Sequence, residues 1–129
     1  MAETMAAGRR VSFRPTVAAD LPYMIDKPLP HRIRAITAVL DGEVIGIGGL
    51  GYRPDSTTIA FAEISDTLRK YPLAVHRAGR MGMALIKASG VPLVISEAQP
   101  NNPAAERWLK HFGFEPTELC GRKAFVWRR

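Results

Sequence analysis

The sequence AITAVLDGEVIGIGGL, residues 35–50, decides the fold. Two apolar runs, 35–40 and 44–50, flank Asp41-Gly42, a dipeptide that favours the tight turn of a β-hairpin. Glycine recurs in the second run, at Gly46, Gly48 and Gly49, which indicates a close backbone approach or a bulge. Residues 53–57 form a turn signal, and 58–64 have the composition of a third strand. The centre of the chain is therefore predicted to be an antiparallel meander.

Helix and strand patterns alternate on both sides of the meander. Before it, the patterns predict a strand over residues 11–14, a helix over 16–25 with Pro22 in its first turn, and a loop over 27–34. After it, they predict a helix from Pro72 to the stop at Gly90, a buried strand over 91–96, a helix over 103–112 and a strand over 123–128. This order predicts an α/β chain with one mixed, mostly antiparallel sheet flanked by helices.

Length and charge limit the classes of protein to consider. With 129 residues, the chain has the size of one domain. We expect residues 1–8 to be a flexible lead-in and 9–129 to be a single domain. The net charge of +6 favours anionic partners without choosing among them. No apolar run approaches the roughly 20 residues that span a bilayer, and Cys120 is the single cysteine. We therefore expect a soluble, cytoplasmic protein that does not bind membranes.

Several motifs in this order resemble the GNAT superfamily of N-acyltransferases. The segment VSFRPT at 11–16, with Asp20 four residues on, is similar to the family's first strand and helix start. The Asp41-Gly42 turn followed by VIG at 44–46 is similar to its second and third strands. Asn102, Ala105 and GFEP at 113–116 are similar to its last helix and the strand entry that follows. The chain also resembles the short GNAT-like proteins of tailed phages, in its altered phosphate loop at residues 77–82 and in the short segment between its first two strands at residues 26–34.

The resemblance implies acetyl-CoA as co-substrate, with its pyrophosphate on a loop written Q/R-x-x-G-x-G/A before the central helix. The matching segment is RAGRMG at 77–82, in which arginine stands where the first glycine belongs. A helix that begins at Pro72 would displace this loop to about 68–72 or remove it, because residues inside a helix have already used their N–H groups. Basic side chains would then supply the charge. The candidate cofactor-binding residues are Arg69, Lys70, Arg77, Gly79, Arg80, Gly82 and Asn102.

Glu63 is the candidate catalytic residue, because the family commonly uses a glutamate to take a proton from the substrate amine. If Ile59 and Phe61 face the core, strand alternation places Glu63 on the same side. Leu109 stands where the family often has a tyrosine that protonates the leaving thiolate. Between the first two strands, residues 26–34 leave room for a loop only, so the acceptor site is short.

Two functions follow. The first is an N-acetyltransferase that moves an acetyl group from acetyl-CoA to a small amine or a protein amine by direct attack. The second is a catalytically inactive structural or accessory protein of the same fold, of the kind phages encode, that acts through protein partners. The basic surface raises nucleic-acid binding as a third, weaker reading, but the chain lacks a recognition motif for it. His31 and His76 lack metal-ligand spacing, so no metal is expected. A homodimer is also compatible with the sequence.

Overall fold

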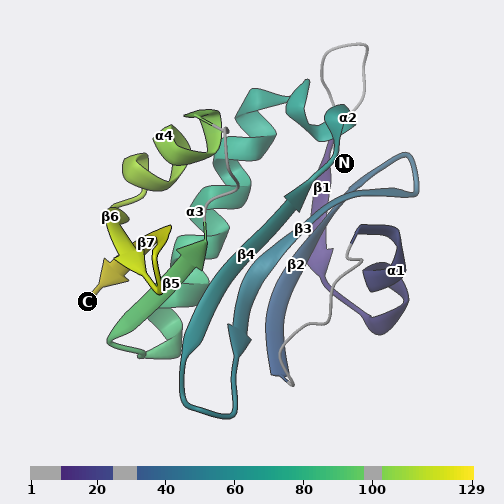
Figure 1. The fold of residues 1–129 in the computed structure, drawn as a ribbon. Helices are drawn as coiled ribbons and strands as arrows, with labels where there is room; N and C mark the ends of the chain where they lie inside the picture. Colours follow the sequence, from purple (N-terminus) through teal and green to yellow (C-terminus); the bar gives the residue numbers. More distant parts are fainter. Residues whose placement is uncertain (1–9, 25–31, 98–102) are drawn as a thin grey trace.

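The computed structural model describes residues 10–24, 32–97 and 103–129. The expected lead-in, 1–8, and Asn102 lie outside the described residues. The described elements form one sheet with helices on both faces (Figure 1), so the predicted fold class is confirmed. In chain order they are β1 (Ser12–Pro15), η2 (Ala18–Asp20), α1 (Leu21–Met24), β2 (Arg32–Leu40), β3 (Glu43–Tyr52), β4 (Thr58–Ile64), α2 (Asp66–Arg69), α3 (Pro72–Ser89), β5 (Leu93–Glu97), α4 (Pro103–His111), β6 (Glu115–Leu119) and β7 (Arg122–Arg128).

The seven strands have the spatial order β1-β2-β3-β4-β5-β7-β6. Neighbouring strands are antiparallel except β4 and β5, which run parallel because α2 and α3 carry the chain back between them. Within the described chain, β4 pairs with β5 at one position, Ile59 with Ile95. Beyond Ile59, β4 continues its ladder with β3. The residues that follow β5, 98–102, are not among the described ones.

The central hairpin is the predicted one. Asp41 and Gly42 have φ angles of 52° and 81°, and positive values at both positions characterise the type I′ turn. The β2–β3 register shifts between Ala38 and Val39, because Ile45 is an extra residue on β3. Such a bulge bends the strand and increases its local twist.

The long helix α3 begins at Pro72 and stops at Gly90, as predicted. Proline is favoured at the first helical position because it has no N–H to leave unpaired. Gly90 has a φ of 76°, the left-handed conformation that closes many helices. The short helix α2 precedes it and is capped by Ser65, whose Oγ accepts the N–H of Leu68 at 3.2 Å. None of the described helices combines the length and the apolar character needed to cross a membrane.

Three local predictions are wrong. Residues 32–34 belong to β2 rather than to a loop, because they pair with the end of β3. The predicted helix over 16–25 is a 3₁₀ turn followed by the four-residue α1. Strand β6 was missed by the periodicity of the sequence, although the resemblance at residues 113–116 implied a strand entry there. It is an edge strand with nearly every side chain exposed, so it shows no alternation of apolar and polar residues. A turn at Cys120 and Gly121, both with positive φ, joins it to β7.

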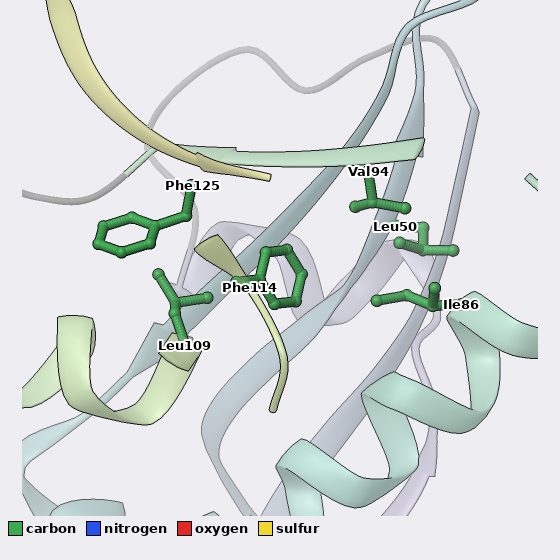
Figure 2. Close-up of a cluster of buried hydrophobic side chains, with 6 residues drawn as sticks. All are labelled: Leu50, Ile86, Val94, Leu109, Phe114 and Phe125. Carbon is green, nitrogen blue, oxygen red and sulfur yellow. The ribbon is translucent and has the colours of Figure 1, made fainter. Parts of the chain in front are cut away.

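A cluster of buried side chains joins α3 and α4 to the sheet (Figure 2). Its members come from β3, α3, β5, α4, the segment before β6, and β7, and they point toward one another. Burying a side chain of this size is worth about 1.5–3 kcal/mol, so this cluster fixes both helices against the same face. The residues are Leu50, Ile86, Val94, Leu109, Phe114 and Phe125.

Helices α3 and α4 meet at Gly79. A Cβ at this position would collide with the ring of Phe112 and lie 2.8 Å from Cζ2 of Trp108. Glycine inside a helix costs about 1 kcal/mol relative to alanine, and here the close approach of α4 explains it. Gly82 lies almost one turn further along α3, and a Cβ there would have no neighbour within 4 Å. A methyl side chain would therefore fit at Gly82 but not at Gly79.

We expect Gly79→Ala to destabilise the protein by about 1–3 kcal/mol, because the added methyl group overpacks the α3–α4 contact. Gly82→Ala is the matched control. It should leave stability unchanged or raise it by up to about 1 kcal/mol, since only helix propensity changes. Urea unfolding followed by circular dichroism measures both. Equal effects of the two substitutions would contradict the packing role of Gly79.

The N-terminal segment is held to the sheet by Asp20, which is 3% exposed. Its carboxylate accepts hydrogen bonds from both Nη atoms of Arg14, at 2.8 and 2.9 Å. It also accepts the backbone N–H of Val17 at 2.9 Å and the hydroxyl of Thr37 at 3.0 Å. The Arg14 guanidinium, with the Val17 amide, holds the pKa of Asp20 well below its ordinary value. One carboxylate thus joins β1, η2 and β2.

Stability should fall in acid through Asp20. Above about pH 4, the ordinary pKa of an aspartate, this carboxylate is ionised in both the folded and the unfolded chain and its contribution is complete. Below that pH the unfolded chain binds the proton first, so the contribution is lost as the pH falls toward the depressed folded pKa. Asp20→Asn should lower the melting temperature at pH 7 and flatten its decline between pH 5 and 2. Asp66→Asn, at an exposed position, should leave the slope unchanged.

Candidate functional site

A cavity of about 100 Å³ lies between the sheet and helices α3 and α4. Small residues leave this space on both sides. Gly48 and Ala62 face each other on β3 and β4, and Ala78 and Gly82 lie on α3. Protein interiors are normally packed without such voids. Space bounded by small residues on two elements is therefore a candidate binding site.

The cavity is almost wholly apolar. Among the described residues that line it, Glu63 on β4, Ser96 on β5 and Trp108 on α4 have polar side-chain atoms. Ser96 is buried at 8% exposure, and Glu63 is half-buried. A ligand in this space would meet hydrophobic walls and a few fixed polar groups, the usual character of a small-molecule site.

The structure places Glu63 on the face of the sheet opposite to α3. Its register partner on β3 is Ile47, whereas Ala60 pairs with Leu50, which packs against α3. Alternation puts Ile59, Phe61 and Glu63 on one side, and all three are half-buried. This is the face on which α1 lies (Figure 1).

The segment predicted to be a phosphate loop, residues 77–82, lies inside α3. Its backbone N–H groups are committed to the helix, and Gly79 packs closely against Phe112 and Trp108. The side chains of Arg77 and Arg80 are exposed on the helix surface. The structure therefore keeps the charges of this motif accessible but does not present its backbone amides to a phosphate.

The amides just before this segment are also largely engaged. Pro72 has no N–H, and Ala74 and Val75 donate to the carbonyl of Tyr71 at 2.9 and 3.0 Å. Tyr71 itself donates to Leu68 at 2.9 Å. In the first turn of α3 this leaves the amide of Leu73 to meet an anion. A pyrophosphate cradle built from successive backbone amides is thus not formed here.

Four candidate cofactor-binding side chains carry positive charge near the start of α3. Arg69 and Lys70 lie at the end of α2, and Arg77 and Arg80 follow on α3; all four are exposed. In the described part of the chain, none of them belongs to an ion pair. They can therefore pair with phosphate oxygens through their side chains. Asn102 lies outside the described residues.

On α4, Leu109, at the position where the resemblance leads one to expect a tyrosine, is buried in the core. Trp108 lies beside it, half-buried, with its ring edge-on to Phe112 at 5.2 Å between centroids. His111 is exposed and stacks near His76 and Phe112, at 5.4 and 4.9 Å. The sequence did not single out Ser96 or Trp108 as lining a site. Ser96 had one available signal, since it interrupts an otherwise apolar strand.

Comparison with known proteins finds likeness in structure only. No protein-family model matches the sequence, and no curated protein matches it. Many solved structures do match. The IAA acetyltransferase of Bacillus cereus ATCC 14579 has a TM-score of 0.66 at 12% identity, over 93% of this chain and 100% of that one. An acetyltransferase of the GNAT family from Staphylococcus aureus MU50 has a TM-score of 0.68 at 8% identity, over 92% and 98%.

A third structure was solved with a bound molecule. The Salmonella typhimurium protein yncA, which holds acetyl-CoA as its cofactor, has a TM-score of 0.67 at 12% identity, over 92% of this chain and 93% of that one. Identities this low establish architecture and leave the site to be argued from its own residues. The chain has the fold of the GNAT acetyltransferases, as the sequence predicted.

Proposed function

We propose that this protein is an N-acyltransferase that moves an acyl group from acetyl-CoA, or a related acyl-CoA, to an amine. The observation that carries the proposal is the position of Glu63. It is the acidic residue among the described residues that border the apolar cavity, and alternation along β4 directs its side chain to the face of the sheet opposite to α3.

The thioester end of the donor fits this position. Beyond Ile59, alternate residues of β4 direct N–H and C=O groups away from β3, toward the side on which Ile59 pairs with Ile95 of β5. A backbone N–H there can hold the acyl carbonyl oxygen and stabilise the negative charge that develops on it. The bound donor supplies a carbonyl carbon activated for attack by its thioester bond.

The carboxylate of Glu63 would accept the proton that the amine loses as its nitrogen attacks. Glu63 faces the side of the sheet on which α1 lies, so the amine would approach from there. The products are an amide and free CoA. The CoA thiolate takes a proton from water because Leu109 has none to give, and the protonated Glu63 returns its proton to the hydroxide left behind. A neutral amine needs little assistance, so positioning supplies much of the rate.

The phosphate end of the donor fits less closely. The backbone amides of residues 77–82 are inside α3, so the exposed side chains of Arg69, Lys70, Arg77 and Arg80 would hold the phosphates instead. Long side chains lose conformational freedom on binding and are screened by salt. We therefore expect binding that weakens as the ionic strength rises.

The occupied backbone amides and the buried Leu109 support a second candidate function. A GNAT fold whose phosphate amides are occupied and whose tyrosine is replaced by Leu109 suits a structural or accessory protein, of the kind tailed phages encode, that acts through a protein partner. The two functions differ in whether the chain binds CoA.

Acetyl-CoA at about 100 times its dissociation constant should raise the melting temperature by roughly 3–6 °C, because ligand at that excess adds about 2.7 kcal/mol of stability. Arg77→Ala should remove most of this rise, and Arg122→Ala, the same charge change on β7, should keep it. Thermal scans with acetyl-CoA and with adenosine 3′,5′-bisphosphate measure the effect. If millimolar acetyl-CoA does not raise the melting temperature, the proposed enzymatic function is wrong and the accessory role is favoured.

If the protein is active, Glu63→Gln should lower kcat at neutral pH by about 10²-fold or more, the usual contribution of a general base. The deficit should shrink at high pH, where more of the amine is already neutral. Release of CoA thiol from a panel of primary amines gives the rates. Glu118→Gln, at an exposed position on β6, is the control, and a uniform loss across all pH values would argue against a role in proton transfer.

A further inference from the structure

The outer sides of helices α3 and α4 adjoin each other. The rings of His76 on α3 and His111 on α4 lie 5.4 Å apart between centroids, and both side chains are exposed. Deeper in the same contact, Gly79 packs against Trp108 and Phe112. The solvent-facing sides of the two helices (Figure 1) are therefore joined into one surface at this contact.

The part of this surface that comes from α3 is basic. Arg77, Arg80 and Lys87 are exposed, and helical spacing puts Arg80 and Lys87 on the same side as His76, with Arg77 beside them. Helix α3 is described over its whole length, and its sequence contains no aspartate or glutamate. Side chains three residues apart on a helix are neighbours, so Arg77 and Arg80 hold two like charges together. The positive charge of α3 is not offset within the helix.

Helix α4 extends the basic surface. Arg107 and Lys110 are exposed and three residues apart, on the side of α4 that carries His111. The acidic residue of α4, Glu106, accepts a hydrogen bond from Nζ of Lys123 on β7 at 2.9 Å. Within the described chain, neither Arg107 nor Lys110 belongs to an ion pair. We call the exposed cations of the two helices the basic helix surface: Arg77, Arg80, Lys87, Arg107 and Lys110.

The composition of the basic helix surface indicates the chemistry of its partner. Protein interfaces depend on a few buried aromatic or apolar anchors, and helices that lie on membranes insert an apolar face. Of the large hydrophobic side chains that are exposed in the described chain, Leu73 is the one on α3 or α4. Several unpaired cations with a single exposed apolar side chain suit a row of phosphates, the usual electrostatic footprint of a nucleic-acid site.

We propose that the basic helix surface binds the phosphate backbone of double-stranded DNA without preference for base sequence. The 18 residues of α3 extend over about 27 Å, and duplex DNA carries one negative charge for about every 1.7 Å of its axis. The major groove of DNA admits an α-helix between its two rows of phosphates, whereas that of duplex RNA is too narrow. Contacts to phosphates carry no sequence information, which agrees with a chain that lacks a recognition motif.

This inference does not rest on the proposed function. Arg77 and Arg80 are also candidates for the phosphates of the acyl donor, but Lys87, Arg107 and Lys110 are not. Substitutions on α4 therefore separate the two kinds of binding. Arg107→Gln combined with Lys110→Gln should leave the thermal shift with acetyl-CoA as it is in the unaltered protein, whether that shift is present or absent.

Fluorescence anisotropy with a labelled DNA duplex of about 20 base pairs tests the proposal at several salt concentrations. The logarithm of the binding constant should fall linearly with the logarithm of the salt concentration, by about 0.9 for each phosphate neutralised. Arg107→Gln with Lys110→Gln should reduce this slope by about 2 and weaken binding about tenfold to hundredfold at 50 mM salt. Arg32→Gln with Arg53→Gln, which removes two exposed arginines from the sheet, should change neither quantity.

Three competitors decide what kind of polyanion is bound. A duplex of unrelated sequence should bind equally well, and a duplex RNA and poly-glutamate should both bind more weakly. Circular dichroism shows whether both double variants keep the fold. The inference is overturned if the protein does not bind the duplex at 50 mM salt, or if the two double variants weaken binding equally. It is also overturned if poly-glutamate binds as tightly as DNA, which would indicate an acidic protein partner, or if RNA binds more tightly.

Discussion

The contact between α3 and α4 at Gly79 governs the rest of the site. Phe112 and Trp108 fill the volume that a side chain at Gly79 would take, so the two helices are closer than larger residues would permit. That approach fixes the Trp108 indole and commits Gly79 to packing. Because aromatic rings occupy the space next to the Gly79 backbone, a phosphate cannot approach that backbone as well. Gly79 therefore matters both for the lining of the cavity and for the phosphate loop that was expected at residues 77–82.

The loss has a defined electrostatic consequence. Backbone amides at a helix N-terminus are fixed donors whose ordering was completed on folding, and they act together with the helix dipole. Exposed arginine and lysine side chains carry full charges, but they must be ordered by the ligand and are screened by salt. If Arg77 and its basic neighbours hold the phosphates, as proposed, the site keeps long-range attraction for an anion but gives up geometric selectivity for a pyrophosphate.

Local chemistry made the fold predictable. Asp41-Gly42 permits the positive φ angles of a tight turn, and Pro72 and Gly90 set the ends of α3, so these elements follow from a few residues each. Strand β6 could not be found in this way, since an exposed edge strand has no apolar periodicity and is specified by its pairing with β7. Turn and cap signals are local, whereas edge pairing is set by the rest of the sheet.

The site was less predictable for the same reason. Alternation along β4 correctly placed Glu63 on the same side as Phe61, but which elements cover that side depends on the packing of the whole sheet. Glu63 lies on the face opposite to α3, and Trp108 belongs to the helix face. The proposed chemistry therefore requires the donor and the amine to meet at the side of β4 that faces away from β3, so the backbone of β4 matters to it as much as any side chain.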